Sequence, residues 1–337
     1  MPKLLNRYCE ILARDGNEER TYNGLNFGLD GHRTNDLQPN ELNLKIHNLN
    51  KDSRDWITRE HLNIEIVAGY TEHHGQIFKG AVKFGSSVRE GGDWITDLVL
   101  KDGDIAWRNI FINQSFAKGT PMDKVIEKLF NEITGLPKQL TDQFQKINQA
   151  AQGRKDIVPV LLFPKTKAQT KKKKNSKDPP PTPEQVKQRQ QQLSSQRQKA
   201  ANVKLERARI TRGSAMDKLD LFCKSYGLHA VWDQQTLNIL PADVALADNL
   251  PEIAVGSGLV GNVEPIIDTV QKNYESQQFL NGWSFRANIN HEIQPGHLVW
   301  LDSINYVGAL LIKRVEYKGQ LRGGDWIQVT EGTPYEV

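Results

Sequence analysis

Several short motifs in this chain have residue types that could do chemistry. Residues 256–261 read GSGLVG and match the Gly-rich dinucleotide-binding pattern, in which backbone N–H groups at a helix N-terminus bind a pyrophosphate. That chemistry requires a helix directly after the glycines, and Pro265 interrupts any helix that starts there. We therefore expect no dinucleotide site and no other cofactor.

Histidines are the candidates for metal ligands. His291 and His297 resemble the two ligands of a zinc-protease motif, but they lie six positions apart instead of four. The intervening Pro295-Gly296 also prevents the helix that would place both rings on one face. His73 and His74 have no third ligand nearby in the sequence. We expect no metal site.

Carboxylates could act as a general acid and base. Asp93 and Asp325 could form such a pair, but each follows two glycines in an expected hairpin turn, where Asp caps its own backbone. No Ser-His-Asp or Cys-His set has a favourable local spacing. We predict no catalytic residues and no enzyme activity. A hydrolase acting on peptidoglycan is the alternative function that would need such a set.

The turns that hold these aspartates belong to a repeated pentapeptide. The sequence GGDWI occurs at residues 91–95 and again at 323–327, which is 232 positions later. Each copy follows an apolar strand and opens a second strand with Trp, as expected for a β-hairpin. Either a common hairpin is used twice, or a whole β-domain is duplicated. The predicted structural positions are Gly91, Gly92, Asp93, Trp94, Gly323, Gly324, Asp325 and Trp326.

Composition limits the class of protein. Hydrophobic residues make up 38% of the 337 residues, and no apolar run is long enough to cross a membrane, so we expect a soluble protein. Cys9 and Cys223 are predicted to be core residues and not a disulfide framework. The first fifteen residues include charged side chains within their apolar patch, which argues against a signal peptide. We expect folding in a cytoplasm.

The net charge of +4 conceals one strongly basic segment. Residues 165–212 hold 15 Lys and Arg against 3 Asp and Glu, so they carry +12 and the remainder carries −8. The Pro- and Gln-rich part, 165–204, cannot bury a core and is predicted to be disordered. It is a candidate contact for a partner or for nucleic acid, and DNA binding through it is the second alternative function. The residues concerned are Lys171, Lys172, Lys173 and Lys174.

The remaining elements predict three folded parts around this segment. Residues 1–102 alternate apolar and polar positions as half-buried strands do, with one short helix around residues 55–57. Residues 103–164 and 205–243 predict a small α/β domain, with helices at 122–130 and 215–226 and a strand pair at 228–232 and 236–240. Residues 244–337 return to the β pattern.

These residues resemble a known family. They are similar to baseplate hub proteins of contractile-tailed phages, of the late control protein D and Mu-like type, with relatives among type VI secretion spikes. The resemblance covers nearly the whole chain except residues 165–204. The motifs are residues 39–49 (PNELNLKIHNL), 68–70 (AGY), 77–80 (IFKG), 256–265 (GSGLVGNVEP), 293–296 (IQPG) and 315–319 (VEYKG).

The resemblance implies an architecture and a function. The fold would be α+β and mainly β, with two tube-protein-like β-barrel domains, 1–102 and 244–337, flanking the interrupted α/β domain. The protein would be a structural baseplate hub in the virion, a homotrimer whose pseudo-sixfold ring joins a sixfold tail tube to a threefold spike and surrounds the tail channel. Its partners would be tail tube or distal tail protein, spike, tape measure protein and baseplate wedge proteins, with no membrane. Because no needle or lysozyme-like domain follows the last strand, the spike is expected to be a separate polypeptide.

Overall fold

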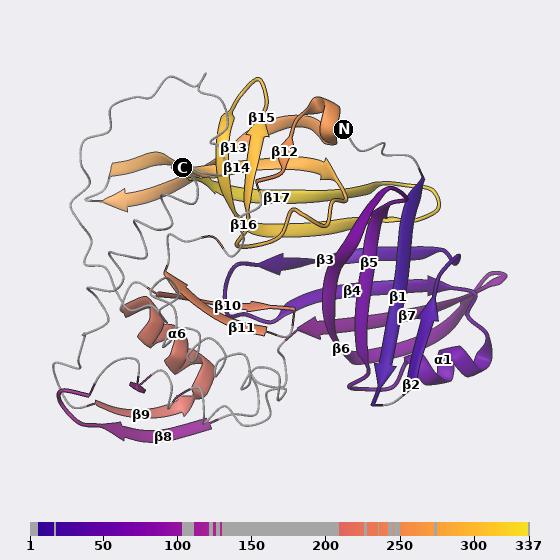
Figure 1. Ribbon diagram of the computed structural model, residues 1–337, viewed down its shortest axis with the longest axis horizontal. Coiled ribbons are helices and arrows are strands. Elements are labelled where there is room, and N and C mark those ends of the chain that lie inside the picture. The colour runs from indigo at the N-terminus through magenta and orange to yellow at the C-terminus, as the bar shows by residue number, and fades with distance from the viewer. Residues whose placement is uncertain are drawn as a thin grey trace, which may run out of the picture.

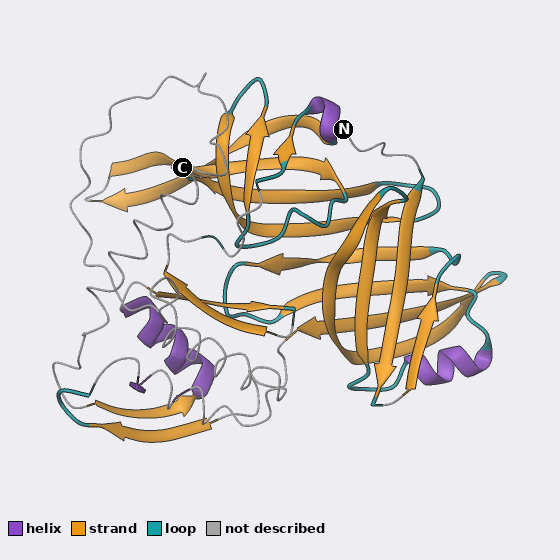
Figure 2. Cartoon of the chain, viewed as in Figure 1, coloured by secondary structure: helices purple, strands orange, loops and turns teal. Residues whose placement is uncertain are grey.

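The structure is a computed structural model of the 337-residue chain. It describes residues 6–16, 18–102, 111–120, 209–225, 228–234, 236–241, 250–272 and 275–335, with the single positions 124, 125, 129, 245. This part is mainly β, and only two short α-helices are complete within it (Figure 2). None of the described helices is long and apolar enough to cross a membrane.

The first β-region comprises residues 6–102. In β4 the side chains of Leu42, Leu44 and Ile46 are fully buried, while Asn43 and Lys45 between them are exposed. This period of two is what places one face of a strand in a core. Its elements are β1 (Arg7–Asp15), β2 (Glu18–Tyr22), β3 (Phe27–Thr34), β4 (Asn40–His47), α1 (Lys51–Ile57), β5 (Asn63–Tyr70), β6 (His73–Glu90) and β7 (Asp93–Asp102).

The second β-region comprises residues 250–335. Its core residues, among them Val299 and Tyr317, belong to the same buried cluster as Leu44 and Ile66 of the first region. Its elements are β12 (Glu252–Ile253), the 3₁₀ turn η1 (Val255–Ser257), β13 (Leu259–Lys272), β14 (Glu275–Asn288), β15 (Leu298–Asp302), β16 (Val307–Gln320) and β17 (Trp326–Pro334).

Between the two β-regions lies a small α/β region. Its helix α6 (Ala215–Ser225) begins with an acidic first turn and ends with Lys224, as the helix dipole favours, which confirms the helix predicted there. The predicted strand pair is also confirmed. The strands are β8 (Phe111–Phe116), β9 (Arg209–Ser214), β10 (Leu228–Asp233) and β11 (Thr236–Pro241). Most of the helix predicted at 122–130, and all of 165–204, lie outside the described residues.

One antiparallel seam joins the two β-regions. Strand β16 pairs with β3 from Arg314 opposite Thr34 to Gln320 opposite Gly28. The two regions thereby become one 13-stranded sheet, with the order β13-β14-β17-β16-β3-β4-β7-β6-β5-β1-β2 and β12-β15 attached to β16 (Figure 1). This path ends at β13 and at β2. Closure of each region into a barrel therefore stays a prediction.

The two β-regions repeat one strand order. Strands β3-β4-β7-β6-β5-β1 of the first correspond to β13-β14-β17-β16-β15-β12 of the second, both in pairing and in order along the chain. The outermost pair differs, because β12 runs parallel to β15 whereas β1 runs antiparallel to β5. Strand β2 has no counterpart among the described strands.

Irregular features recur at corresponding places. A bulge leaves Lys83 as the additional residue of β6 opposite β7, and a second bulge leaves Lys313 as the additional residue of β16 opposite β17. Two residues before β5 and β15 the backbone is left-handed, at His61 (φ 67°) and Gly296 (φ 81°). Bulges and left-handed residues are specific backbone features. Their recurrence favours duplication of a whole β-unit over repeated use of a common hairpin.

Candidate functional site: the repeated hairpins and the joint between the β-regions

The first repeated hairpin is the tip of β6 and β7. Glu90 pairs with Asp93, which leaves a two-residue turn with Gly91 at φ 60°. The Asp93 carboxylate accepts a hydrogen bond from the Asn48 side chain (3.0 Å), and the side chain of Asn48 accepts one from the Trp94 amide (3.0 Å). Asp93 therefore orders its own turn against the loop before α1. Gly92 does not have a positive φ, so Gly91 is the position where this turn requires glycine.

The second repeated hairpin, between β16 and β17, has a longer turn. The ladder ends at Gly319 opposite Trp326, and both glycines of the motif are left-handed, Gly323 at φ 80° and Gly324 at φ 65°. The Arg7 guanidinium donates hydrogen bonds to the carbonyl oxygens of Gly323 (3.1 Å) and Gly324 (2.8 Å). This tip is thus fixed by a residue of β1, in the other β-region.

The two tryptophans of the motif lie in opposite environments. Trp326 is 1% exposed and its indole N–H donates to the Gly69 carbonyl (3.1 Å), so it is buried against the β5–β6 hairpin. Trp94 is 37% exposed and is covered on one face by the Arg54 guanidinium, 3.9 Å from the ring centroid. The same pentapeptide therefore forms an internal contact in one region and leaves a large aromatic surface open in the other.

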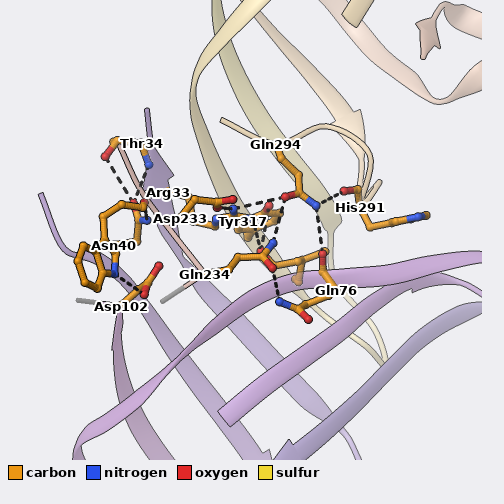
Figure 3. Close-up of polar contacts among 12 residues, drawn as sticks. Arg33, Thr34, Asn40, Gln76, Asp102, Asp233, Gln234, His291, Gln294 and Tyr317 are labelled. Carbon is orange, nitrogen blue, oxygen red and sulfur yellow. Dashed lines mark hydrogen bonds and ion pairs between the residues drawn. The ribbon is translucent and has the colours of Figure 1, made fainter. Parts of the chain in front are cut away.

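A buried polar cluster lies where both β-regions meet the α/β region (Figure 3). Arg33 of β3 is 1% exposed, donates to the Ile77 carbonyl (2.6 Å) and forms an ion pair with Asp233. Burial acts to lower the pKa of Arg33, but the charge of Asp233 and the nearby Tyr317 raise it, so the guanidinium stays charged. A buried charge with these partners fixes three chain segments relative to one another.

Three glutamines extend this cluster across the joint. Gln76 of β6 donates to Gln234, which follows β10, and Gln234 donates to the Gln294 side chain (3.0 Å). Gln294 in turn donates to the Gln76 carbonyl (3.3 Å) and to the His291 carbonyl (2.7 Å), as Figure 3 shows. Each of the three comes from a different region, so their amides connect all three parts of the described chain.

The α/β region is fastened to the first β-region through β10. The Trp232 indole N–H donates to the Asp102 carboxylate (2.6 Å), and both side chains are buried. Asn40, which is also buried, donates to the Trp232 carbonyl (3.1 Å), and the Trp232 amide donates to the Asp36 carbonyl (2.9 Å). Burial of an indole with a satisfied N–H is a strong anchor.

Histidines also lie at this joint, and His73 and His291 are neighbours there. His73 shares a hydrogen bond with Asn290 (3.0 Å), and its ring centroid lies 4.8 Å from that of His291. Within the described residues, no group of three or more His, Cys, Asp and Glu side chains could hold a metal ion. The GSGLVG segment forms η1 and then enters β13, so no helix follows its glycines.

Acid is expected to weaken this joint. Burial lowers the pKa of His229, His291 and His297 below the ordinary value of 6.5. The folded state then binds fewer protons than the unfolded state, so stability is fully present above pH 6.5 and is lost as the pH falls through the lowered values. The urea midpoint should decrease from pH 7.5 to pH 5.5. The His291→Gln variant should show a shallower decrease, and an equal slope in both proteins would contradict this assignment.

Sequence reasoning placed the repeated hairpins but missed the joint. Arg33 and Asp233 lie 200 positions apart, and no local spacing connects them. The only signal was an arginine at a position of β3 that alternation assigns to the core. The lysines Lys171, Lys172, Lys173 and Lys174 lie outside the described residues, so their role as partner contacts stays a prediction.

Two solved tail proteins are similar to this chain in fold. Comparison with models of protein families and with curated proteins found no match. Among solved structures, the 43 kDa tail protein of prophage MuSo2 from Shewanella oneidensis aligns over 96% of this chain and 98% of its own, with 7% identity and a TM-score of 0.55. The tail protein from Neisseria meningitidis MC58 aligns over 97% of this chain and 96% of its own, with 11% identity and a TM-score of 0.52.

The alignments extend over nearly the full length of both chains in each case. The chain therefore has the fold of phage tail proteins. The resemblance to proteins of phage tails that the sequence indicated is thereby confirmed at the level of the fold.

Proposed function

We propose that this chain is the structural hub of a contractile phage tail baseplate. Three copies form a closed ring in which the six β-regions occupy similar positions. The ring joins a sixfold tail tube to a threefold spike and surrounds the channel between them. In this role the protein performs no catalysis, and it is located in the tail baseplate of the virion.

The observation that carries this proposal is the repeated strand order. The chain contains two equivalent β-units joined edge to edge by β16 and β3. This contact inside one chain is the kind of contact that would repeat between neighbouring units around a ring. Repetition of a heterologous contact with a closing rotation produces a ring with cyclic symmetry. Three chains then supply six similar units to a sixfold partner, while the single α/β region of each chain supplies a threefold feature.

The joint supports this role through its rigidity. A hub must keep its two β-units in one fixed orientation, because any hinge between them would change the rotation from unit to unit. Directional contacts connect the two units. The Gln294 side chain of the second unit accepts from Arg33 (3.5 Å) and donates to the Gln76 carbonyl (3.3 Å). The buried Trp326 indole donates to the Gly69 carbonyl (3.1 Å). Partners proposed for the ring are tail tube or distal tail protein, a separate spike, tape measure protein and wedge proteins.

The mass of the purified protein in solution tests the proposal. One chain is 38.2 kDa, so light scattering should give about 115 kDa for three copies. Electron micrographs of the same sample should show rings with six lobes in end views. A protein that remains a monomer at every concentration, and forms no rings, would contradict the hub function.

A further inference from the structure

The two equivalent strands β6 and β16 differ in how many neighbours they have. Residues 314–319 of β16 pair with β17 on one side, and residues 314–320 pair with β3 on the other. Residues 84–90 of β6 pair with β7, but β5 pairs with β6 only up to Ala81. Within the described residues, the outer edge of 84–90 therefore has no strand beside it. An unpaired edge exposes a row of backbone donors and acceptors.

The bulges align these two edges residue by residue. Because Lys83 and Lys313 are the additional residues of corresponding bulges, Phe84 corresponds to Arg314 and Val88 corresponds to Lys318. In the second β-region, the segment that begins at Arg314 is the one that pairs with β3. The unpaired edge of β6 is thus the counterpart of the edge that joins the two β-regions.

The counterpart of β3 has an unpaired edge as well. β13 is the last strand of the sheet order, and among the strands that the structure describes it pairs with β14 alone. Asp30 of β3 lies opposite Asn43, and Glu264 of β13 lies opposite Ser284 at the corresponding place of the ladder. Asp30 also lies opposite Lys318 in the β16–β3 seam. Glu264 is therefore the counterpart of Asp30, just as Val88 is the counterpart of Lys318. In an equivalent seam between β6 and β13, Val88 would lie opposite Glu264.

Both unpaired edges carry exposed apolar side chains. Phe84 and Val88 on β6 are 58% and 44% exposed, and Ile267 on β13 is 54% exposed. At the same end of the β6–β7 hairpin, Trp94 is open where its counterpart Trp326 is buried by a neighbouring β-unit. Apolar residues on an unpaired edge promote pairing with another chain.

We propose that residues 84–90 of β6 in one copy add antiparallel to β13 of a second copy, in the register of the β16–β3 seam. Val88 then lies opposite Glu264, and Ser86 lies opposite Ile266. This inference rests on the proposed ring and names the edges that close it. Pro265 falls opposite Ser87 and has no N–H, so the seam between copies has one backbone hydrogen bond fewer than the internal seam.

A cysteine pair tests this register. In the internal seam, backbone hydrogen bonds join Asn35 to Lys313 and Leu321 to Phe27, which makes Lys318 and Asp30 a non-hydrogen-bonded pair. Such pairs have Cα atoms about 4.5 Å apart, close enough for a disulfide. Val88→Cys combined with Glu264→Cys should form a disulfide between copies on mild oxidation, giving multimers that dissociate on reduction. The native Cys9 and Cys223 are buried and do not compete.

Two matched controls accompany this variant. Lys318→Cys with Asp30→Cys should form the equivalent disulfide inside one chain and give no covalent multimers. Val88→Cys with Ile266→Cys shifts the pair by two residues and should form covalent multimers at least tenfold more slowly.

The same samples distinguish a failure of the proposed edge pairing from a failure of the ring proposal. A trimer by light scattering that does not crosslink through residues 88 and 264, or crosslinks as fast in the shifted pair, overturns this inference and leaves the ring proposal standing. A protein that neither crosslinks nor assembles overturns both.

Discussion

Replacing Trp326 with alanine is expected to lower the free energy of unfolding by about 3–5 kcal/mol, the usual loss for a buried aromatic. The indole is 1% exposed, and its N–H is satisfied by the Gly69 carbonyl of the neighbouring β-region. Truncation removes this packing, leaves a cavity at the joint and orphans a buried carbonyl. The same change at Trp94 removes mainly a cation–π contact with Arg54, worth about 0.5–1 kcal/mol at an exposed site.

Trp94 is therefore a matched control inside the same chain, because both residues follow the sequence GGD and lie at the start of a strand. Urea unfolding followed by far-UV circular dichroism measures both variants without depending on tryptophan fluorescence. The measurement belongs at a protein concentration where the chain is monomeric, since assembly adds to the stability of either variant. Equal losses at both positions would show that the burial of Trp326 does not hold the two β-regions together.

The two tryptophans also show how far the sequence can predict this fold. Alternation and turn chemistry are local, so they located the strand pattern of residues 1–102, the GGDWI turns and the β10–β11 pair, and the repeated motif left duplication as one of two explanations. Burial of Trp326 and exposure of Trp94 depend on which β-unit lies beside each hairpin. Two identical pentapeptides carry no information about that. Sequence therefore predicted the hairpins but not their different surroundings.

The joint was not predictable for a related reason. Arg33, Asp233 and Gln294 belong to three different regions, and each alone reads as an ordinary polar residue. Their contact follows from the β16–β3 seam and from the docking of β10, which are pairings between distant segments. A single sequence gives no register for such pairings, since the alternation of β3 is compatible with any apolar neighbour.

Replacing Arg33 with methionine is expected to destabilise the folded chain by about 3–5 kcal/mol, the usual cost of removing one partner of a buried ion pair. The substitution leaves Asp233 without its cation and the Ile77 carbonyl without its donor. The double variant Arg33→Met with Asp233→Leu should cost clearly less than the two single variants together. With both charges absent, only the lost hydrogen bonds and the altered packing remain.

A double-mutant cycle by urea denaturation measures this coupling. Strictly additive losses would mean that the ion pair has no energetic role at the joint.

In the double variant we expect the free energy of unfolding to recover, while the fixed angle between the β-units does not. Two apolar side chains can restore the free energy of burial, but they lack the directional contacts by which Arg33 joins β6 to the α/β region and to Gln294 of the second β-region. Because a ring closes only if each chain holds one fixed angle between its β-units, the double variant should regain stability and still form fewer closed rings than the native chain. A double variant that forms rings as well as the native chain would place the angular control elsewhere in the joint.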